Sequence, residues 1–327
     1  MFRYTRILIP TDFTYCSFYA MKYAVALAKR YTAKLDLVHC VSTAPFMPWA
    51  STSYWMWSEG LCAQEACMCE RAGARLRHLG RMIASEGIDV ECRVIRGVPG
   101  EQIVGTAREL KSELVVVGTH GRVGVEHALF GSVAEEVARH APAPVLTIKH
   151  PEHEFIEFRG GNVLLRRVLY PTDFSEYSLS TLPYAGSLCR EFEATLILQH
   201  VVEPVVFGGE YLPEAVIPAM DDPEYDGRKR LERIADELTG VKVEMCQSSG
   251  VPSHEIVRIA HDIGADLVVI PTHGRSGVAR MLFGGVARKV LRYCRCPVMT
   301  VRPEMVPVRQ QNASDADEAH LYYGAGV

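Results

Sequence analysis

The stretch LVVVGTHGRVGVEHALFGSVA, residues 114–134, returns as LVVIPTHGRSGVARMLFGGVA, residues 267–287, with 14 of 21 positions identical. A second pair of segments repeats near the start of each copy, RILIPTDF from Arg6 and RVLYPTDF from Arg167. Repeats of this length, with strand-like runs and glycine turns, indicate two homologous domains rather than a solenoid of small units. The length of 327 residues favours the same domain count.

Charge and hydropathy exclude several classes of protein. The formal net charge is −4 and no basic cluster occurs, which argues against nucleic acid as a partner. No apolar run approaches the roughly 20 residues that span a bilayer. The first residues, MFRYTRILIPTDF, carry an apolar run too short for a secretory signal. We therefore expect a soluble cytoplasmic protein with neither nucleic acid nor a membrane as partner.

The ten cysteines do not form a framework, because their positions differ between the two copies. Neither the Cys62, Cys67 and Cys69 group nor the Cys294 and Cys296 pair has the C-x-x-C spacing that is typical of zinc sites. Without an export signal we expect reduced thiols and no metal held by the protein itself.

Strand-like runs and helical stripes alternate along each copy. Five strands alternating with four helices favour a parallel sheet covered on both faces, and right-handed crossovers make a flavodoxin-like order our first choice. We predict two tandem flavodoxin-like (Rossmann-type) α/β domains, each a five-stranded parallel sheet with helices on both faces. In the first copy the strands are predicted at 6–10, 34–41, 90–95, 114–118 and 144–148, and the helices at 15–31, 59–86, 100–110 and 132–140.

The repeat also predicts the domain boundaries. The first domain spans 1–150, a polar linker 151–165, the second domain 166–303, and a tail at 304–327 lacks periodicity and is predicted to be disordered. The segment 45–57 holds all three tryptophans. Aromatic residues at this density can form an interaction surface or a lid; a loop that folds over its own domain is the interpretation that we favour.

The glycine-rich loop is the candidate binding site. After the strand at 114–118 the chain reads Gly118-Thr-His-Gly121, then nine residues, then Gly131-Ser132 at the start of a helix. Glycines let the backbone approach a ligand, and the free amides at a helix start attract phosphate. The pattern is neither a Walker loop nor a G-x-G-x-x-G fingerprint. Spacing alone leaves open whether these glycines bind phosphate or only form turns.

At this point the chain resembles the universal stress protein family in its tandem, ATP-binding form. The signature G-x-x-G, nine residues, G-[S/T] matches without a gap, and several further motifs occur in the expected order in both copies. They are the Pro10-Thr11-Asp12 turn, the His39-Cys40 end of the second strand, and the turns Gly97-Val98-Pro99 and Gly250-Val251-Pro252.

The resemblance implies a binding site for ATP, with Mg²⁺ held through the phosphates. Asp12 would lie near the ribose, the main chain at Cys40 near the adenine, and the glycine loop with Ser132 at the phosphates. For Asp12 an Asx turn or a helix-capping role is the alternative. The implied cofactor-binding residues are Pro10, Thr11, Asp12, Cys40, Gly118, His120, Gly121, Arg122, Gly131, Ser132 and Val133, with weaker counterparts at Asp173, Val201, Gly274 and Gly284.

The two loops differ at two positions that matter. Pro271 replaces Gly118 and offers no backbone N–H, and Gly285 replaces Ser132 and removes its hydroxyl. Losing one hydrogen bond to a charged group costs about 1.5–3 kcal/mol. We therefore predict that the first domain binds ATP well and the second poorly or not at all.

The sequence contains no catalytic base, nucleophile or arginine finger placed for fast phosphoryl transfer, and we assign no catalytic residue. The expected function is a cytoplasmic stress-response regulator that senses ATP. The alternatives are an interaction scaffold independent of nucleotide, or a slow ATPase or autophosphorylating protein. An unidentified protein partner is expected. The last strands, 144–148 and 297–301, are predicted to pair within one chain as a pseudo-dimer, and two chains can associate as a homodimer.

Overall fold

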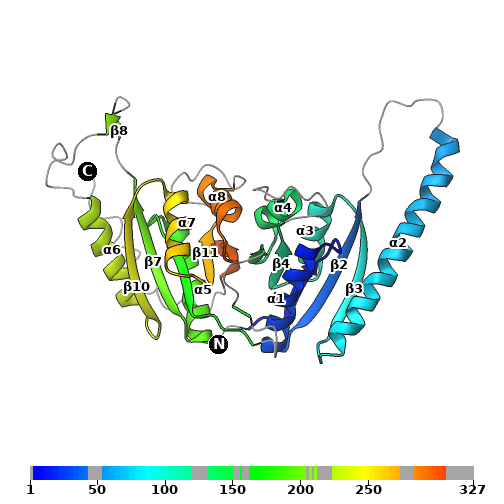
Figure 1. Cartoon of the computed structure of the whole chain (residues 1–327), viewed down its shortest axis with the longest axis horizontal. Helices are drawn as coiled ribbons and strands as arrows, with labels where there is room; N and C mark the ends of the chain where they lie inside the picture. Colours follow the sequence, from blue (N-terminus) through cyan, green and yellow to red (C-terminus); the bar gives the residue numbers. More distant parts are fainter. Residues whose placement is uncertain are drawn as a thin grey trace. The chain divides into compact units, whose positions relative to one another are not determined.

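The chain forms two compact units, one spanning Arg3–Leu164, the N-terminal unit, and one beginning at Leu165, the C-terminal unit. Figure 1 shows the elements of both. The structure is a computed structural model, and it describes residues 3–42, 54–119, 131–149, 155–156, 162–203, 206–207, 210–211, 223–272 and 283–306.

The N-terminal unit is a parallel sheet with strand order β3-β2-β1-β4-β5. Its first strand pairs with both β2 and β4, so β1 lies at the centre. The elements are β1 (Arg6–Pro10), α1 (Tyr15–Tyr31), β2 (Lys34–Ser42), α2 (Tyr54–Ala84), β3 (Val90–Gly97), α3 (Pro99–Glu109), β4 (Leu114–Gly118), α4 (Ser132–His140) and β5 (Val145–Ile148).

The C-terminal unit repeats this plan with strand order β10-β7-β6-β11-β12. It adds a two-stranded antiparallel hairpin, β8 (Val206–Phe207) and β9 (Glu210–Tyr211), which the sequence did not predict. The other elements are β6 (Arg167–Pro171), α5 (Glu176–Phe192), β7 (Thr195–Val202), α6 (Pro223–Glu237), β10 (Lys242–Ser249), α7 (Pro252–Asp262), β11 (Leu267–Pro271), α8 (Gly285–Tyr293), β12 (Val298–Val301) and the 3₁₀ turn η2 (Pro303–Met305).

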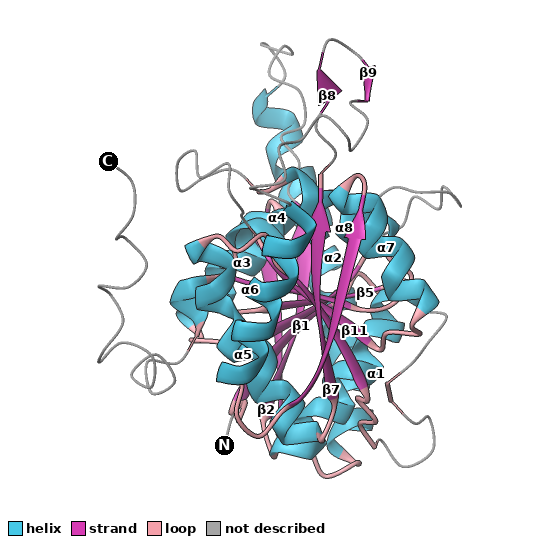
Figure 2. Ribbon diagram, turned by 90° about the vertical axis from the view of Figure 1, so that its left-hand side faces the viewer, coloured by secondary structure: helices cyan, strands magenta, loops and turns pink. Residues whose placement is uncertain are grey.

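The predicted fold class is confirmed: each unit is a five-stranded parallel sheet with helices on both faces (Figure 2). The strand order differs from our first choice: within each sheet it is 3-2-1-4-5, the Rossmann-type order, and not the flavodoxin order 2-1-3-4-5, because the second crossover continues outward past the second strand. Right-handed crossovers then place α1 and α2 on one face and α3 and α4 on the other, and α3 contacts α4. The order reverses between β1 and β4, and ligands of such sheets bind at the carboxyl ends of the strands at this point.

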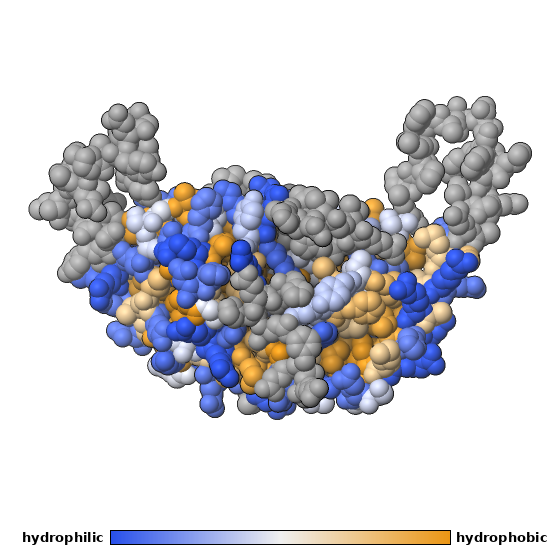
Figure 3. Space-filling view, viewed as in Figure 1, coloured by the Kyte–Doolittle hydropathy of each residue, from blue (hydrophilic) through white to orange (hydrophobic). Residues whose placement is uncertain are grey.

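The central strands are apolar because both of their faces are covered. Ile7, Leu8 and Ile9 in β1 are fully buried, as are Leu114 and Val115 in β4. The helices turn polar faces outward. Figure 3 accordingly shows hydrophilic side chains predominating on the visible face of the C-terminal unit. No helix in the described ranges is long and apolar enough to cross a bilayer.

Three details differ from the sequence prediction. Helix α2 begins at Tyr54 rather than residue 59, so Trp55 and Trp57 belong to a helix and not to the predicted loop. Part of the predicted linker packs on the N-terminal unit: Phe155 is buried against Tyr23, with ring centroids 4.9 Å apart. Near the other end, Val306 is buried directly after η2. The remaining tail residues lie outside the described part of the chain.

Candidate functional site

The crevice between β1 and β4 is the candidate site of the N-terminal unit. The amide of Thr119 donates to the carbonyl oxygen of Ile148 in β5 at 3.1 Å. Because successive amides of a strand point to opposite sides, the N–H of Gly118 faces the end of β1. Strand β1 ends at Pro10, and the turn residues follow directly after it. One backbone donor is thus directed toward the predicted ligand position.

Two glycines let backbones meet closely at this crevice. A Cβ atom at Gly118 would lie 2.8 Å from the carbonyl oxygen of Cys16 in α1, and one at Gly131 would lie 2.5 Å from the carbonyl oxygen of Thr119. The amide of Gly131 donates to that same oxygen at 2.8 Å. The carbonyl of Thr119 and the amide of Gly131 therefore join the two ends of the glycine loop.

Helix α4 begins at this junction without a cap. Gly131 is its N-cap, and no side chain among the described residues accepts a hydrogen bond from its first amides. Helix α1 differs, because the side chain of Thr14 accepts a hydrogen bond from the amide of Ser17. The first-turn amides of α4 have no intrahelical acceptor. With Ser132 and Val133 exposed, this helix start can accept an anion.

The turn after β1 is held by its own side chains. The hydroxyl of Thr11 is buried, lies 3.0 Å from the hydroxyl of Ser17, and accepts a hydrogen bond from the amide of Phe13. Asp12 forms the Asx turn that we considered, since its Oδ1 accepts the amide of Thr14 at 3.0 Å. Asp12 Oδ2 accepts no hydrogen bond from the residues described. Thr11 therefore shapes the turn, and Asp12 keeps one oxygen for a ligand.

Three side chains that the sequence did not single out as a group support this turn. The ring of Phe13 lies between the ring of His39, with centroids 4.4 Å apart, and the guanidinium of Arg75, at 4.4 Å. His39 Nδ1 also lies 2.7 Å from the carbonyl oxygen of Thr11. Phe13 has φ of 62°, a conformation that costs a non-glycine residue about 1–3 kcal/mol. The stack stabilises this unfavourable backbone beside Asp12.

The same stack recurs in the C-terminal unit. Phe174 has φ of 60°, lies 4.2 Å from the ring of His200, and lies 4.4 Å from the guanidinium of Arg230. The sequence has Phe and His at corresponding positions in both copies, so this part of the stack could have been found from the repeat. The arginine could not have been found in this way, because it comes from the helices α2 and α6, where the two copies align poorly.

Cys40 lies at the end of β2, where its half-buried thiol is 3.6 Å from the carbonyl oxygen of Gly97. Burial raises the pKa of the Cys40 thiol to about 11. At neutral pH the side chain is therefore a neutral thiol, which is a poor nucleophile and metal ligand. Only its main chain remains for the predicted contact with a base.

We expect Cys40 to be alkylated by iodoacetamide about 100-fold more slowly at pH 8 than a thiol of ordinary pKa, with a rate that still rises at pH 10. Exposed Cys67 is the internal control, and mass spectrometry of the full chain reads both sites. Because the folded pKa exceeds the unfolded one, this group stabilises the fold below about pH 9 and loses that effect as pH rises through 11. Equal rates for Cys40 and Cys67 at pH 8 would contradict the assignment.

Four predicted site residues, His120, Gly121, Arg122 and Gly274, lie outside the described residues. The structure brings the other N-terminal residues to one edge of the sheet. Pro10 ends β1, Cys40 lies near the end of β2, and Gly118 ends β4, with Gly131 beside it.

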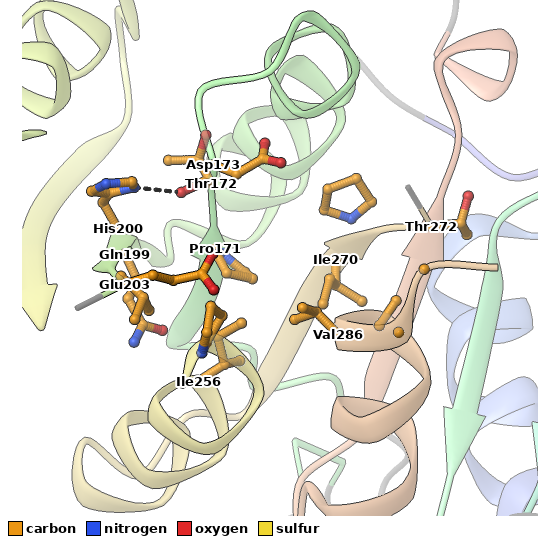
Figure 4. Close-up of a pocket in the computed structure, with 16 residues that line it drawn as sticks. Pro171, Thr172, Asp173, Gln199, His200, Glu203, Ile256, Ile270, Thr272 and Val286 are labelled. Atoms are coloured by element: carbon orange, nitrogen blue, oxygen red, sulfur yellow. Dashed lines mark hydrogen bonds between the residues drawn. The ribbon is translucent and has the colours of Figure 1, made fainter. Parts of the chain in front are cut away.

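The C-terminal unit has the same frame. Asp173 Oδ1 accepts the amide of Ser175 at 3.0 Å, and the amide of Gly284 donates to the carbonyl oxygen of Thr272 at 2.8 Å. Asp173, Thr272 and Gly284 border a pocket of about 280 Å³ at the carboxyl ends of β6, β7 and β11 (Figure 4), and Val201 also lines it. Pro271 ends β11, and α8 starts at Gly285, where no side chain in the described part of the chain forms a cap.

Within the described ranges, no group of three or more His, Cys, Asp or Glu side chains is placed to hold a metal ion. Cys294 and Cys296 are both buried with their sulfur atoms 3.4 Å apart. Burial and the neighbouring Cys294 thiol raise the pKa of Cys296, the hydrogen bond to Cys294 being the larger cause.

Comparisons with known proteins agree with this architecture. The model of the universal stress protein family matches residues 3–149 and 165–302. A universal stress protein of Methanocaldococcus jannaschii is 33% identical over 151 residues, 46% of this chain and 85% of that protein. One from Mycolicibacterium smegmatis is 24% identical over 306 residues, 91% of this chain and 97% of that protein. The crystal structure of a universal stress protein from Archaeoglobus fulgidus superposes with a TM-score of 0.65 at 22% identity, covering 92% of this chain and all of the other.

Proposed function

The chain belongs to the universal stress protein family in its tandem two-domain form, and from this we propose that it is a cytoplasmic stress-response regulator that senses ATP through its N-terminal unit. The observation that carries the proposal is the uncapped start of α4, placed beside the crevice between β1 and β4. A glycine N-cap, free amides and a serine at the first helical position form an anion site at the switch point of the sheet.

The residues around the crevice fit ATP by the chemistry of their donors and acceptors. The N–H of Gly118, the first amides of α4 and the hydroxyl of Ser132 are donors for phosphate oxygens. Asp12 Oδ2, which accepts no hydrogen bond from the described residues, is an acceptor for ribose hydroxyls, and the main chain at Cys40 offers hydrogen bonds to a base. Bound Mg²⁺ would neutralise charge on the phosphates and needs no protein ligand set. Gly118 and Gly131 allow this close approach of backbone segments, because a Cβ atom at either position would collide with backbone atoms.

The C-terminal unit is proposed to bind ATP more weakly. Pro271 has no N–H to direct into its crevice, and Gly285 has no hydroxyl. One lost hydrogen bond to a charged group corresponds to about one to two decades of affinity. The proposal includes the predicted pairing of residues 144–148 with 297–301 within one chain, and association with a protein partner.

Hydrogen exchange of the full chain with and without Mg-ATP tests the proposal. We expect ATP to slow exchange at the amides of residues 11–14 and 131–134, because the bound ligand would cover these two segments. The corresponding amides of residues 172–175 and 284–287 should change little at the same ATP concentration. Protection confined to the C-terminal unit, or none in either unit, would contradict the proposed site.

We expect Gly285→Ser to tighten ATP binding at the C-terminal unit by about 10-fold, since it restores one hydroxyl donor to a charged ligand. A Cβ at Gly285 meets no atom of the described residues within 4 Å, so the Cβ itself fits without a shift. Gly285→Ala is the matched control, which adds the Cβ without the hydroxyl. Calorimetric titration of both variants reads the effect, and equal affinities for the two would show that the hydroxyl is not a phosphate ligand.

A further inference from the structure

The outward side of helix α2 carries basic side chains and methionines at a regular spacing. The helix packs against β2 and β3 of the N-terminal unit (Figure 1), and its side chains Leu76 and Ile83 are buried there. Five exposed residues lie away from this contact, three and four positions apart in turn, so they form one line along the helix. We call this line the α2 seam: Met68, Arg71, Arg75, His78 and Met82.

The basic side chains of the α2 seam form no ion pair with any described residue. Arg75 stacks on the ring of Phe13, which occupies one face of its guanidinium and leaves the N–H groups at the edge. In α6, the corresponding helix of the C-terminal unit, two arginines instead pair with acidic side chains one turn away. Arg71, Arg75 and His78 can therefore donate hydrogen bonds to the carboxylates of another molecule.

Two methionines lie at the ends of the α2 seam. Met68 is 47% exposed and Met82 is 55% exposed. They are two heptads apart, which corresponds to about 21 Å along the helix axis. Exposed ion pairs contribute little to binding by themselves, whereas burial of the methionine side chains adds an apolar contribution. Methionine and arginine are also the residue types that protein interfaces favour over the rest of the surface.

The spacing of the α2 seam indicates the shape of its partner. Alternating steps of three and four residues are those of the contact line between two helices packed lengthwise. A helix that covers the seam would have apolar residues at both ends of its own line and carboxylates between them. A long polyanion fits less well, because the seam ends in methionines and the whole chain has a net charge of −4.

We propose that the α2 seam is the docking surface for an acidic amphipathic helix of a partner protein. Carboxylates of that helix lie opposite Arg71, Arg75 and His78, and its apolar side chains cover the two methionines. The inference rests on the protein partner included in the proposed function, to which it gives a place on the molecule, and it does not depend on ATP binding.

A synthetic helix titrated with the full chain and followed by fluorescence polarisation tests this inference. The seam probe has the order Leu-x-x-Glu-x-x-x-Glu-x-x-Glu-x-x-x-Leu with alanine or glutamine at x. A hydrocarbon staple on its far side holds it helical, because helices of this length are marginal in water. We expect the seam probe to bind the chain, with an affinity that falls as salt rises. A scrambled probe with its glutamates on the opposite side should bind about 10-fold more weakly.

A pair of variants locates the binding surface. Arg71→Glu should weaken binding of the seam probe about 10-fold, because it replaces attraction by repulsion. Arg77→Glu is the matched control, since Arg77 is an exposed arginine of the same helix that points about 120° away from Arg71. It should bind the probe as the wild type does. Circular dichroism verifies the fold of both variants, and both should keep wild-type ATP affinity.

Three results would overturn the inference: no binding of the seam probe, equal binding of the two probes, or equal affinity of Arg71→Glu and the wild type. Binding of phosphatidylserine vesicles or duplex DNA that depends on Arg71 and exceeds that of the probe would also overturn it, because the seam would then recognise a polyanion. A chain that binds the seam probe through Arg71 but binds no ATP contradicts the proposed nucleotide site and supports the docking surface.

Discussion

Ser132→Glu is expected to lower the ATP affinity of the N-terminal unit by about 100-fold, or about 2.7 kcal/mol. The new carboxylate would lie at the first position of α4, where it repels the triphosphate and satisfies the amides that phosphate would use. The fold should not suffer, because Ser132 is exposed and an acidic residue in the first turn stabilises a helix by about 0.3–1 kcal/mol.

Two variants separate charge from other effects. In Ser132→Gln the new side chain is nearly the size of glutamate but uncharged. This variant should lose only the contribution of the serine hydroxyl, about 10-fold in ATP affinity. Gly285→Glu places the same carboxylate at the start of α8 and should leave the N-terminal site unchanged. Wild-type ATP affinity in Ser132→Glu, measured calorimetrically with the fold verified by circular dichroism, would refute the assignment of α4 as the phosphate site.

Asp36→Asn is expected to destabilise the N-terminal unit by about 3 kcal/mol. Asp36 is fully buried in β2 and accepts two hydrogen bonds from Arg6, at 2.6 and 2.9 Å. The hydrogen bond to Asp36 raises the pKa of Arg6. Breaking a buried pair by removing one partner costs about 3–5 kcal/mol. We place the loss at the lower end because the Arg6 side chain is 27% exposed and lies 3.7 Å from Glu91.

The C-terminal unit provides the matched comparison, because Ile197 occupies the position of Asp36. Hydrogen exchange of the full chain should therefore show faster opening of β1 and β2 in Asp36→Asn and unchanged β6 and β7. The double variant Arg6→Leu with Asp36→Leu should recover much of the stability, since apolar replacements of buried pairs are often neutral or better. If Asp36→Asn opens no faster than wild type, the pair contributes nothing to the fold.

The sequence predicts where helices and strands begin and end wherever turn residues mark these positions. β1, α1, β4 and α4 have the predicted bounds, because Pro10, Gly118 and Gly131 punctuate an alternating apolar pattern. Helix α2 started early, since the aromatic run before it carries no breaker that separates loop from helix. The two-residue strands β8 and β9 are too short to leave a periodic signal.

The site was predictable in its backbone and less so in its side chains. Glycines report where backbones must approach, so Gly118 and Gly131 lie where the loop pattern indicated. A sequence motif does not predict which way a hydroxyl points. The Thr11 hydroxyl points into the loop after β1, where it contacts Ser17 Oγ and accepts the amide of Phe13. Arg75 reaches Phe13 from a helix far along the chain, and His39 reaches it from the second strand. These contacts depend on tertiary packing, which spacing alone does not encode.

Native mass spectrometry of the full chain titrated with Mg-ATP tests the central claim most directly. One ATP per chain should bind with high affinity, and Ser132→Glu should abolish that peak at the same concentration. Two ATP molecules of equal affinity per chain, or none at all, would contradict an N-terminal nucleotide site formed by the start of α4.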